Sequence, residues 1–228
     1  MNFEKEKTDA FGKLIEQAED IVLLGHFNPD GDAIGSTLGL HHYLADMGKK
    51  VCIIYPNECP AATMIYLDGI DYIIFSNGEK SARYRIKHAD LLICADFATY
   101  SRTCEQIEEY IGNNDCPKIM IDHHENPEHN GLLFSDPHAS STCELVYKIL
   151  SSYDKTHITL SCATALYMGI CTDTGSFSHS CSRRDVFDVA ACLVEMGVDV
   201  AAIKRQVVDL STENRLRLLG YVLKDKLK

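Results

Sequence analysis

Several features that mark secreted or membrane proteins are missing from this chain of 228 residues. The first nine residues, Met1–Asp9, are rich in charge and contain no apolar stretch of the kind found in signal peptides. No segment approaches the ~20 consecutive apolar residues that a membrane-spanning helix needs. We therefore expect a cytoplasmic protein that has no membrane partner.

An excess of basic residues is also missing. The chain has 22 Lys and Arg against 33 Asp and Glu, so its formal net charge is -11. Proteins that bind long duplex nucleic acid neutralise phosphates with clustered cations, and this balance argues against that class. A small phosphorylated substrate remains compatible with the acidic balance if part of the acidic excess binds metal ions.

Paired cysteines are absent although the chain has 10 cysteines. None of them forms a Cys-x-x-Cys pair, which excludes zinc ribbons and thioredoxin-like motifs. We expect reduced thiols, because a cytoplasmic compartment keeps cysteines reduced. Internal repeats and low-complexity segments are missing too, and the composition, 46% hydrophobic and 24% charged, is that of a globular protein.

Short apolar runs alternate with helical patterns in the first part of the chain. This alternation predicts an α/β fold with a mainly parallel sheet flanked by helices, followed by a helical segment. The predicted strands are Ile21–Leu24, Val51–Tyr55, Ala89–Ala95 and Lys118–Ile121, with helices at Gly35–Met47 and Cys104–Ile111. From Ser141, a capping box predicts a helix over Leu145–Leu150, and the periodicity predicts Thr159–Ile170, Arg184–Met196, Val200–Leu210 and Thr212–Lys228.

Acidic and imidazole side chains follow these apolar segments. The loop after the first strand contains His26, Asp30 and Asp32, although its Asn-Pro-Asp-Gly sequence is also typical of a β-turn. Asp96 follows another strand, Asp122-His123-His124 ends a third, and Asp173 follows an apolar helix. Because ligands bind at the carboxyl ends of parallel strands, we expect these groups to meet.

So many carboxylates in one place would repel each other unless cations lie between them. Mixed carboxylate and imidazole ligands suit divalent metals, and histidine favours Mn²⁺ over Mg²⁺, with Co²⁺ as a further alternative. The number of ligands fits two ions better than one. Paired ions are used to hydrolyse phosphate esters and anhydrides, which is the chemistry that these residues predict.

These motifs resemble those of the DHH phosphoesterase family, whose name matches Asp122-His123-His124. The resemblance runs from about Ile21 to Gly175 and includes four ordered motifs: His26 to Ser36, Asp96, Asp122 to His124, and Asp173. The chain is most similar to the RecJ-like branch of oligoribonucleases that also act as pAp phosphatases. The resemblance implies a manganese-dependent hydrolase that converts short oligonucleotides (nanoRNA), pAp or both to nucleoside monophosphates.

The resemblance also implies a role for each matched residue. His26, Asp30 and Asp96 would bind one ion, and Asp32, Asp96, His123 and Asp173 the other, so that Asp96 bridges them. A water or hydroxide between the ions would attack phosphorus. His124 would face the substrate, and Asp122 would orient a neighbouring histidine or support the loop. Apart from the resemblance, we consider Arg102 as a contact to a substrate phosphate, although an arginine at the start of a helix is usually a solvated surface group. We also consider Ser140, Ser141 and Thr142 as phosphate contacts, although Ser141 has a second explanation as a helix cap.

Relatives of this branch carry a C-terminal substrate-binding domain with a Gly-Gly-Gly-His-type loop, and no such loop occurs in this sequence. We expect residues 1–190 to form the catalytic domain and 191–228 a helical connector toward an absent domain. Two alternatives stay open: a family II-type inorganic pyrophosphatase, and a non-catalytic module that binds metal or nucleotides. The metal, the direction of attack and a homodimeric state are also left open by the sequence.

Overall fold

The computed structural model describes residues 5–57, 67–76, 80–128, 130–205 and 213–226. Within them, six parallel strands form one sheet in the order β3-β2-β1-β4-β5-β6. The strands are β1 (Asp20–Leu24), β2 (Lys50–Tyr55), β3 (Ile73–Phe75), β4 (Leu91–Ala95), β5 (Lys118–Asp122) and β6 (Leu132–Ser135). The predicted α/β architecture is therefore confirmed.

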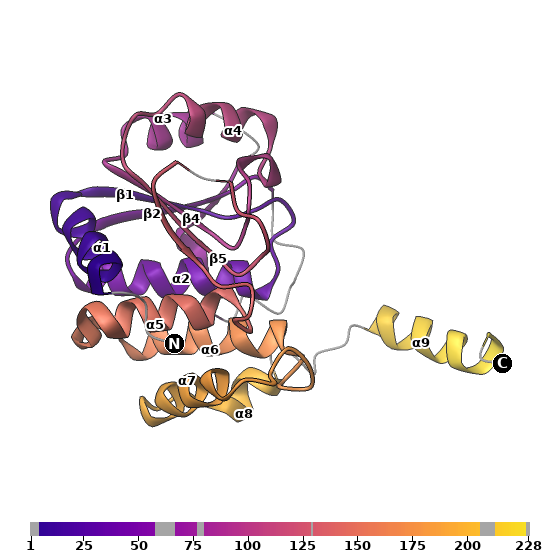
Figure 1. The fold of residues 1–228 in the computed structure, drawn as a ribbon. Helices are drawn as coiled ribbons and strands as arrows, with labels where there is room; N and C mark the ends of the chain where they lie inside the picture. Colours follow the sequence, from indigo (N-terminus) through magenta and orange to yellow (C-terminus); the bar gives the residue numbers. More distant parts are fainter. Residues whose placement is uncertain (1–4, 58–66, 77–79, 129, 206–212, 227–228) are drawn as a thin grey trace.

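Helices cover both faces of this sheet, as Figure 1 shows. The helices α3 and α4 lie over one face, and α2, α5 and α6 lie under the other, with α7 and α8 in a further layer below them. The helices are α1 (Lys5–Gln17), α2 (Gly31–Asp46), α3 (Lys80–Lys87), α4 (Glu105–Gly112), α5 (Thr142–Asp154), α6 (Leu160–Asp173), α7 (Arg184–Glu195), α8 (Val200–Ile203) and α9 (Glu213–Asp225).

The central strands are continuous apolar runs because both of their faces are buried. All five residues of β4 are buried, as are Ile21–Leu24 of β1. A larger core lies between the sheet and α2, α5 and α6, and a smaller core lies beneath α3 and α4. Since all the strands run parallel, their carboxyl ends meet at one edge, where the polar segments begin.

The helices α2 and α6 cross at very short range. A Cβ added to Gly35 would lie 2.6 Å from the carbonyl oxygen of Ala165 and 3.0 Å from the Cα of Gly169. One turn along α2 on either side, Gly31 and Gly39 face the side chains of Thr172 and Leu166. This contact fixes the first turn of α2 against the last turn of α6, and both turns carry acidic residues.

Several elements differ from the sequence-based expectation. The helix α2 begins at Gly31 instead of Gly35, because Asp30 caps it, and α6 extends to Asp173. The prediction missed α1, α3 and the short edge strands β3 and β6. Residues 206–210 of the predicted helix Val200–Leu210, together with Thr212, Leu227 and Lys228, lie outside the described residues.

The C-terminal part of the described core extends beyond the expected domain boundary. Residue 190 lies inside α7, and the buried Leu193, Val198 and Ile203 pack into the same core as α5 and α6. The division at this position stays a prediction. Among the described residues, no helix is long and apolar enough to span a membrane. Nine cysteines are free thiols, whereas Cys59 lies outside the described residues.

Candidate metal centre

The loop after β1 holds a histidine and a carboxylate at the carboxyl edge of the sheet. His26 is 4% exposed, and its Nδ1–H donates a 2.8 Å hydrogen bond to the carbonyl oxygen of Phe27, which leaves Nε2 free as a ligand. Asp30 caps α2, where one carboxylate oxygen accepts hydrogen bonds from the backbone N–H groups of Asp32 and Ala33. The β-turn considered for this segment is therefore a helix cap.

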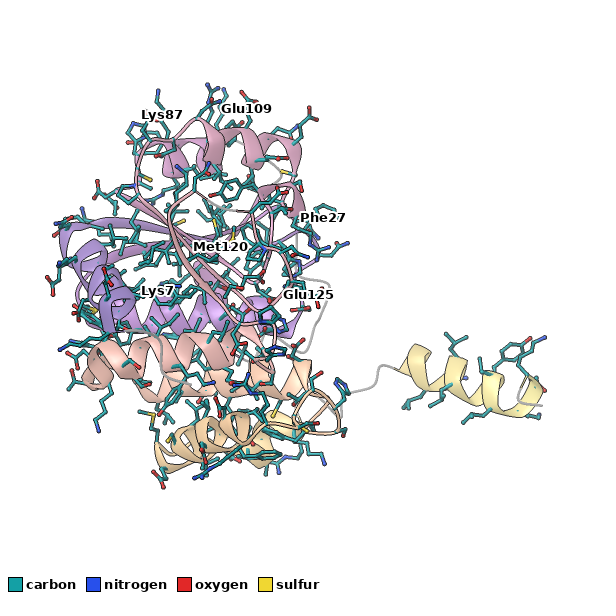
Figure 2. All side chains as sticks on the ribbon, viewed as in Figure 1. Lys7, Phe27, Lys87, Glu109, Met120 and Glu125 are labelled. Carbon is teal, nitrogen blue, oxygen red and sulfur yellow. The ribbon has the colours of Figure 1, made fainter. Side chains whose placement is uncertain are left out.

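The loops that follow β1 and β5, the two strands on either side of β4, reach the same side of the molecule. Figure 2 labels Phe27 and Glu125, which follow β1 and β5 and lie on one side of the structure. Each of them lies next in sequence to a histidine of the predicted site, His26 or His124. The loop after β1 is also joined to the segment after β4, because the N–H of Phe27 donates a 2.8 Å hydrogen bond to the carbonyl of Arg102.

Asp96 lies between two groups of ligand atoms. It follows β4 with a φ of 68°, a left-handed conformation that is rare and strained outside glycine. Its Oδ2 is 3.7 Å from the Nε2 of His26, and its Oδ1 is 3.7 Å from the Nε2 of His123. The side chain is 2% exposed. Its two oxygens thus face in two directions, toward a histidine on each side.

The first group consists of His26, Asp30 and Asp96. The Nε2 of His26 is 4.0 Å from the Oδ1 of Asp30. One ligand atom from each of the three residues lies within 4.8 Å of the others. These are the three residues that the family resemblance implies as ligands of one metal ion.

The second group surrounds His123. Its Nε2 is 3.8 Å from the Oδ2 of Asp32, 3.6 Å from the Oδ2 of Asp173 and 3.7 Å from Asp96. Asp32 lies in the first turn of α2 and Asp173 ends α6, so the close crossing of these helices places them together. The second predicted ligand set is thus gathered around one imidazole nitrogen.

The four carboxylates create a local excess of negative charge. Burial, and next the neighbouring Asp32 and Asp30, raises the pKa of Asp96 well above its usual value, and burial also raises the pKa of Asp32. Burial and Asp32 raise the pKa of Asp173 to about 6. Within the described residues, no Lys or Arg pairs with any of them. Divalent cations fit this donor set and would supply the missing positive charge.

His124 is held by a carboxylate and lies beside the second group. Its Nδ1–H donates a 2.7 Å hydrogen bond to the Oδ1 of Asp122, as the sequence predicted for Asp122 and a neighbouring histidine. This bond raises the pKa of His124, whereas Arg102 lowers it through charge repulsion. The Nδ1 is also 4.0 Å from Asp96, but its hydrogen bond to Asp122 leaves it unsuited to bind metal. Arg102 is exposed and ends a short 3₁₀ turn, not the start of a helix.

The two serines that precede α5 and the threonine that begins this helix do not reach the surface. Ser140, Ser141 and Thr142 are at most 3% exposed, so their use as phosphate contacts is wrong for this structure. The Oγ of Ser141 caps α5, as predicted, but the carboxylate of Glu144 binds Ser140 instead of the backbone of Ser141. Thr142 binds two of the proposed metal ligands, Asp32 and Asp96, a contact that the sequence did not reveal.

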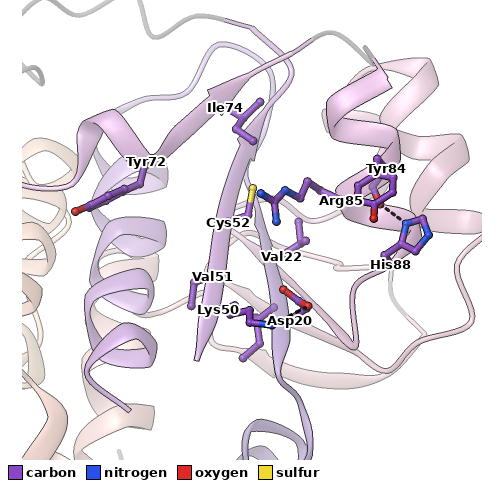
Figure 3. Close-up of a pocket in the computed structure, with 11 residues that line it drawn as sticks. Asp20, Val22, Lys50, Val51, Cys52, Tyr72, Ile74, Tyr84, Arg85 and His88 are labelled. Carbon is purple, nitrogen blue, oxygen red and sulfur yellow. Dashed lines mark hydrogen bonds and ion pairs between the residues drawn. The ribbon is translucent and has the colours of Figure 1, made fainter. Parts of the chain in front are cut away.

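A separate cavity lies away from this centre. It has a volume of about 390 Å³ and extends from Asp20 and Lys50, at the amino-terminal ends of β1 and β2, to α3. Figure 3 shows Arg85 of α3 reaching over Cys52 of β2 in this cavity. None of the proposed metal ligands lines it, so the cavity is distinct from the candidate site.

Comparison with known proteins gives relatives that are named for different activities. A bifunctional oligoribonuclease and PAP phosphatase, NrnA, from Thermus thermophilus is 30% identical over 210 residues, 89% of this chain and 58% of the relative. A cyclic-di-AMP phosphodiesterase, GdpP, from Bacillus subtilis is 29% identical over 208 residues, 86% of this chain and 31% of the relative. The crystal structure of an exopolyphosphatase-related protein from Bacteroides fragilis matches with a TM-score of 0.93 and 35% identity, over 99% of this chain and 67% of that one.

The chain thus spans little more than half of the first of these relatives and a third of the second. The model of the N-terminal domain of the DHH family matches residues 20–170, which contain His26, Asp30, Asp32, Asp96 and His123, while Asp173 lies just beyond. That match covers more than half of the sequence and the whole of the parallel sheet. The chain therefore belongs to the DHH family.

Proposed function

We propose that this chain is the catalytic part of a two-metal phosphoesterase that hydrolyses short oligonucleotides and pAp to nucleoside monophosphates. The observation that carries the proposal is the position of Asp96, whose two oxygens face His26 on one side and His123 on the other. A single buried carboxylate between two ligand groups is the arrangement that a pair of bridged ions requires.

His26, Asp30 and Asp96 would hold one ion, and Asp32, Asp96, His123 and Asp173 the other. The mixture of imidazole and carboxylate favours Mn²⁺, with Mg²⁺ or Co²⁺ as alternatives. When bound, such a pair of ions would lower the pKa of water and stabilise the charge on a phosphoryl group. The hydrogen bond from Nδ1 of His26 to Phe27 fixes the tautomer of the neutral ring, so that the Nε2 lone pair is available as a ligand.

His124 and Arg102 would act on the substrate. Asp122 accepts the Nδ1–H of His124 and so stabilises the protonated ring, which leaves Nε2–H free to donate to a phosphoryl oxygen or to the leaving oxygen. His124 is half exposed, as such a contact requires. Arg102 is exposed and lies near enough to repel a proton on His124, a position suited to a second substrate phosphate.

Small substrates agree best with the charge of the chain, since a net charge of -11 opposes long nucleic acids. The relatives named as oligoribonuclease and PAP phosphatase support oligonucleotides and pAp. The GdpP relative, which matches a similar share of the chain, makes cyclic di-AMP a second candidate substrate. All three substrates are phosphate esters of nucleosides, so the same centre can serve them.

The test is to measure product release from pAp, a dinucleotide, cyclic di-AMP and pyrophosphate in the presence of Mn²⁺. We expect hydrolysis of pAp or the dinucleotide. Cleavage of pyrophosphate alone would favour a family II-type pyrophosphatase, and no hydrolysis of any of the four would favour a binding module. Asp96→Ala should lower the rate of hydrolysis by several orders of magnitude while the circular dichroism spectrum stays unchanged. This result would show that the activity depends on this centre.

A further inference from the structure

The first turn of α5 contacts two of the three carboxylates that face His123, Asp32 and Asp96. The backbone N–H groups of Thr142 and Cys143 donate to Oδ2 and Oδ1 of Asp32, at 2.6 and 2.9 Å. The hydroxyl of Thr142 donates to the Oδ1 of Asp96 at 2.9 Å. One residue thus binds a carboxylate of the second ion's set and also the bridging carboxylate.

These contacts restrict how the two carboxylates can turn. Each oxygen of Asp32 accepts a hydrogen bond from the amino-terminal end of α5, where the helix dipole also favours negative charge. Asp96 accepts its hydrogen bond from the Thr142 side chain, so this contact can be removed by substitution without breaking the backbone. Thr142 itself is fully buried and has no access to a substrate.

A buried ion pair, extended by a part-exposed aspartate, holds this turn in place. Glu144, which is 2% exposed, accepts hydrogen bonds from the backbone N–H and the hydroxyl of Ser140 at 2.8 and 2.7 Å. Its other oxygen accepts from Lys148, which donates in turn to Asp185 of α7 at 3.0 Å. We name these three residues the Glu144–Lys148–Asp185 series. The series restricts the segment before α5 through the hydrogen bonds of Glu144 to Ser140.

Stability alone is a poor explanation for this series. Replacing a buried ion pair with apolar residues of similar volume is often neutral or stabilising, since both charges lose their hydration. What the series does provide is a fixed position for Ser140 and, two residues further on, for Thr142. A carboxylate that must bridge two ions tolerates little freedom, because metal ligands are oriented by their own hydrogen-bond partners.

We propose that Thr142 is a positioning residue that orients the bridging Asp96 together with Asp32, and that the Glu144–Lys148–Asp185 series keeps it in place. The inference rests on the proposed function, since it takes these carboxylates to be metal ligands. It adds residues of α5 and α7 to a centre that the sequence motifs place only on strand ends and on α2 and α6.

The main test is Thr142→Val, which keeps the shape of the side chain and removes its hydroxyl. We expect Mn²⁺, titrated into the metal-free protein by calorimetry, to bind about 10- to 100-fold more weakly. Thr142→Ser should restore the affinity, because serine retains the donor. Thr37→Val is the matched control: its buried hydroxyl binds Ala33 and Tyr55 and no proposed ligand, so its loss should leave Mn²⁺ affinity unchanged.

The series is tested by Glu144→Gln/Lys148→Met, which removes the buried ion pair and leaves only the part-exposed Asp185, which also pairs with Arg183. We expect weaker Mn²⁺ binding than in the parent protein, by a smaller factor than in Thr142→Val. Unchanged affinity in this variant would overturn the role of the series. Unchanged affinity in Thr142→Val, or an equal loss in Thr37→Val, would overturn the role of Thr142. A parent protein that binds no Mn²⁺ would overturn the inference together with the proposed function.

Discussion

Asp122 accepts a 2.7 Å hydrogen bond from the Nδ1–H of His124, and the two residues differ sharply in their exposure. Asp122 is completely buried, and its second oxygen has no hydrogen-bond partner among the described residues. His124 is half exposed at the edge of the metal centre. The buried carboxylate thus fixes the ring orientation and the protonation of a histidine that faces the solvent.

Asp122→Asn tests whether this contact acts on catalysis or on metal binding. An amide accepts the Nδ1–H less strongly than a carboxylate and does not stabilise the protonated ring. We expect kcat to fall about 10- to 100-fold while Mn²⁺ affinity stays close to that of the parent. Steady-state kinetics and calorimetry on the same preparation make the comparison. A matching loss of Mn²⁺ affinity would show that Asp122 acts on His123 and the metal ligands instead.

A second prediction concerns the negative charge of the carboxylate cluster in metal-free protein. In the metal-free protein, Asp96 is buried beside other carboxylates, and no Lys or Arg among the described residues pairs with it. Asp96→Asn removes one negative charge and retains an oxygen that can accept from Thr142. We therefore expect this inactive variant to melt at a higher temperature than the metal-free parent at neutral pH, by about 2–4 °C for each kcal/mol gained.

The control for this prediction is the addition of Mn²⁺. The parent should gain stability from the ions, because a ligand that binds only the folded state raises the melting temperature. Asp96→Asn should gain far less, so the order of the two melting temperatures should reverse. A metal-free variant that melts below the parent would show that the Asp96 charge is compensated.

The proposed ligands could be predicted because their signal is local. Asp96 and His123 directly follow buried apolar strands, and in a parallel sheet such positions share one edge. Asp173 lies at the end of a helix, where its position after an apolar helical segment indicated it, and the order of the motifs supported that assignment. The pairing of Asp96 with both His26 and His123 follows from the same topology, since β4 lies between β1 and β5.

The remaining parts of the site depend on contacts that the sequence does not encode locally. Thr142 is separated in sequence by 46 residues from Asp96 and by 110 residues from Asp32. The sequence around it indicates only the start of a helix. The edge strands β3 and β6 were missed because they contain only three and four residues, too few for a clear pattern. Helix α1 was missed because most of its residues are polar and its buried face is narrow.

A third prediction concerns the close crossing of α2 and α6. Gly35→Ala places a methyl group 2.6 Å from the carbonyl oxygen of Ala165, so the helices must separate. We expect a loss of about 1–3 kcal/mol in the free energy of unfolding. We also expect weaker Mn²⁺ binding, because Asp32 and Asp173 lie on the two helices. Urea denaturation and calorimetry measure the two effects.

Gly112→Ala, in α4, is the control for this substitution. A Cβ at this position meets no atom within 4 Å, so it should leave metal affinity unchanged and cost no stability. If Gly35→Ala bound Mn²⁺ as tightly as the parent did, the helix crossing would not set the spacing of the ligands.

The last prediction concerns a buried histidine of α2 that is not one of the proposed metal ligands. His41 of α2 is 7% exposed and stacks on Tyr72 at 4.8 Å, and burial, then His42, lowers its pKa to about 4 despite the opposing charge of Asp68. Between pH 6.5 and pH 4, the unfolded chain binds a proton that the folded protein does not, so His41 destabilises the fold as the pH falls.

The substitution His41→Phe keeps an aromatic ring and removes this penalty. The free energy of unfolding of His41→Phe minus that of the parent should be about 2 kcal/mol larger at pH 5 than at pH 7.5. Urea denaturation without metal measures both values. If this difference in the free energy of unfolding were the same at both pH values, the pKa of His41 would not be lowered in the folded protein.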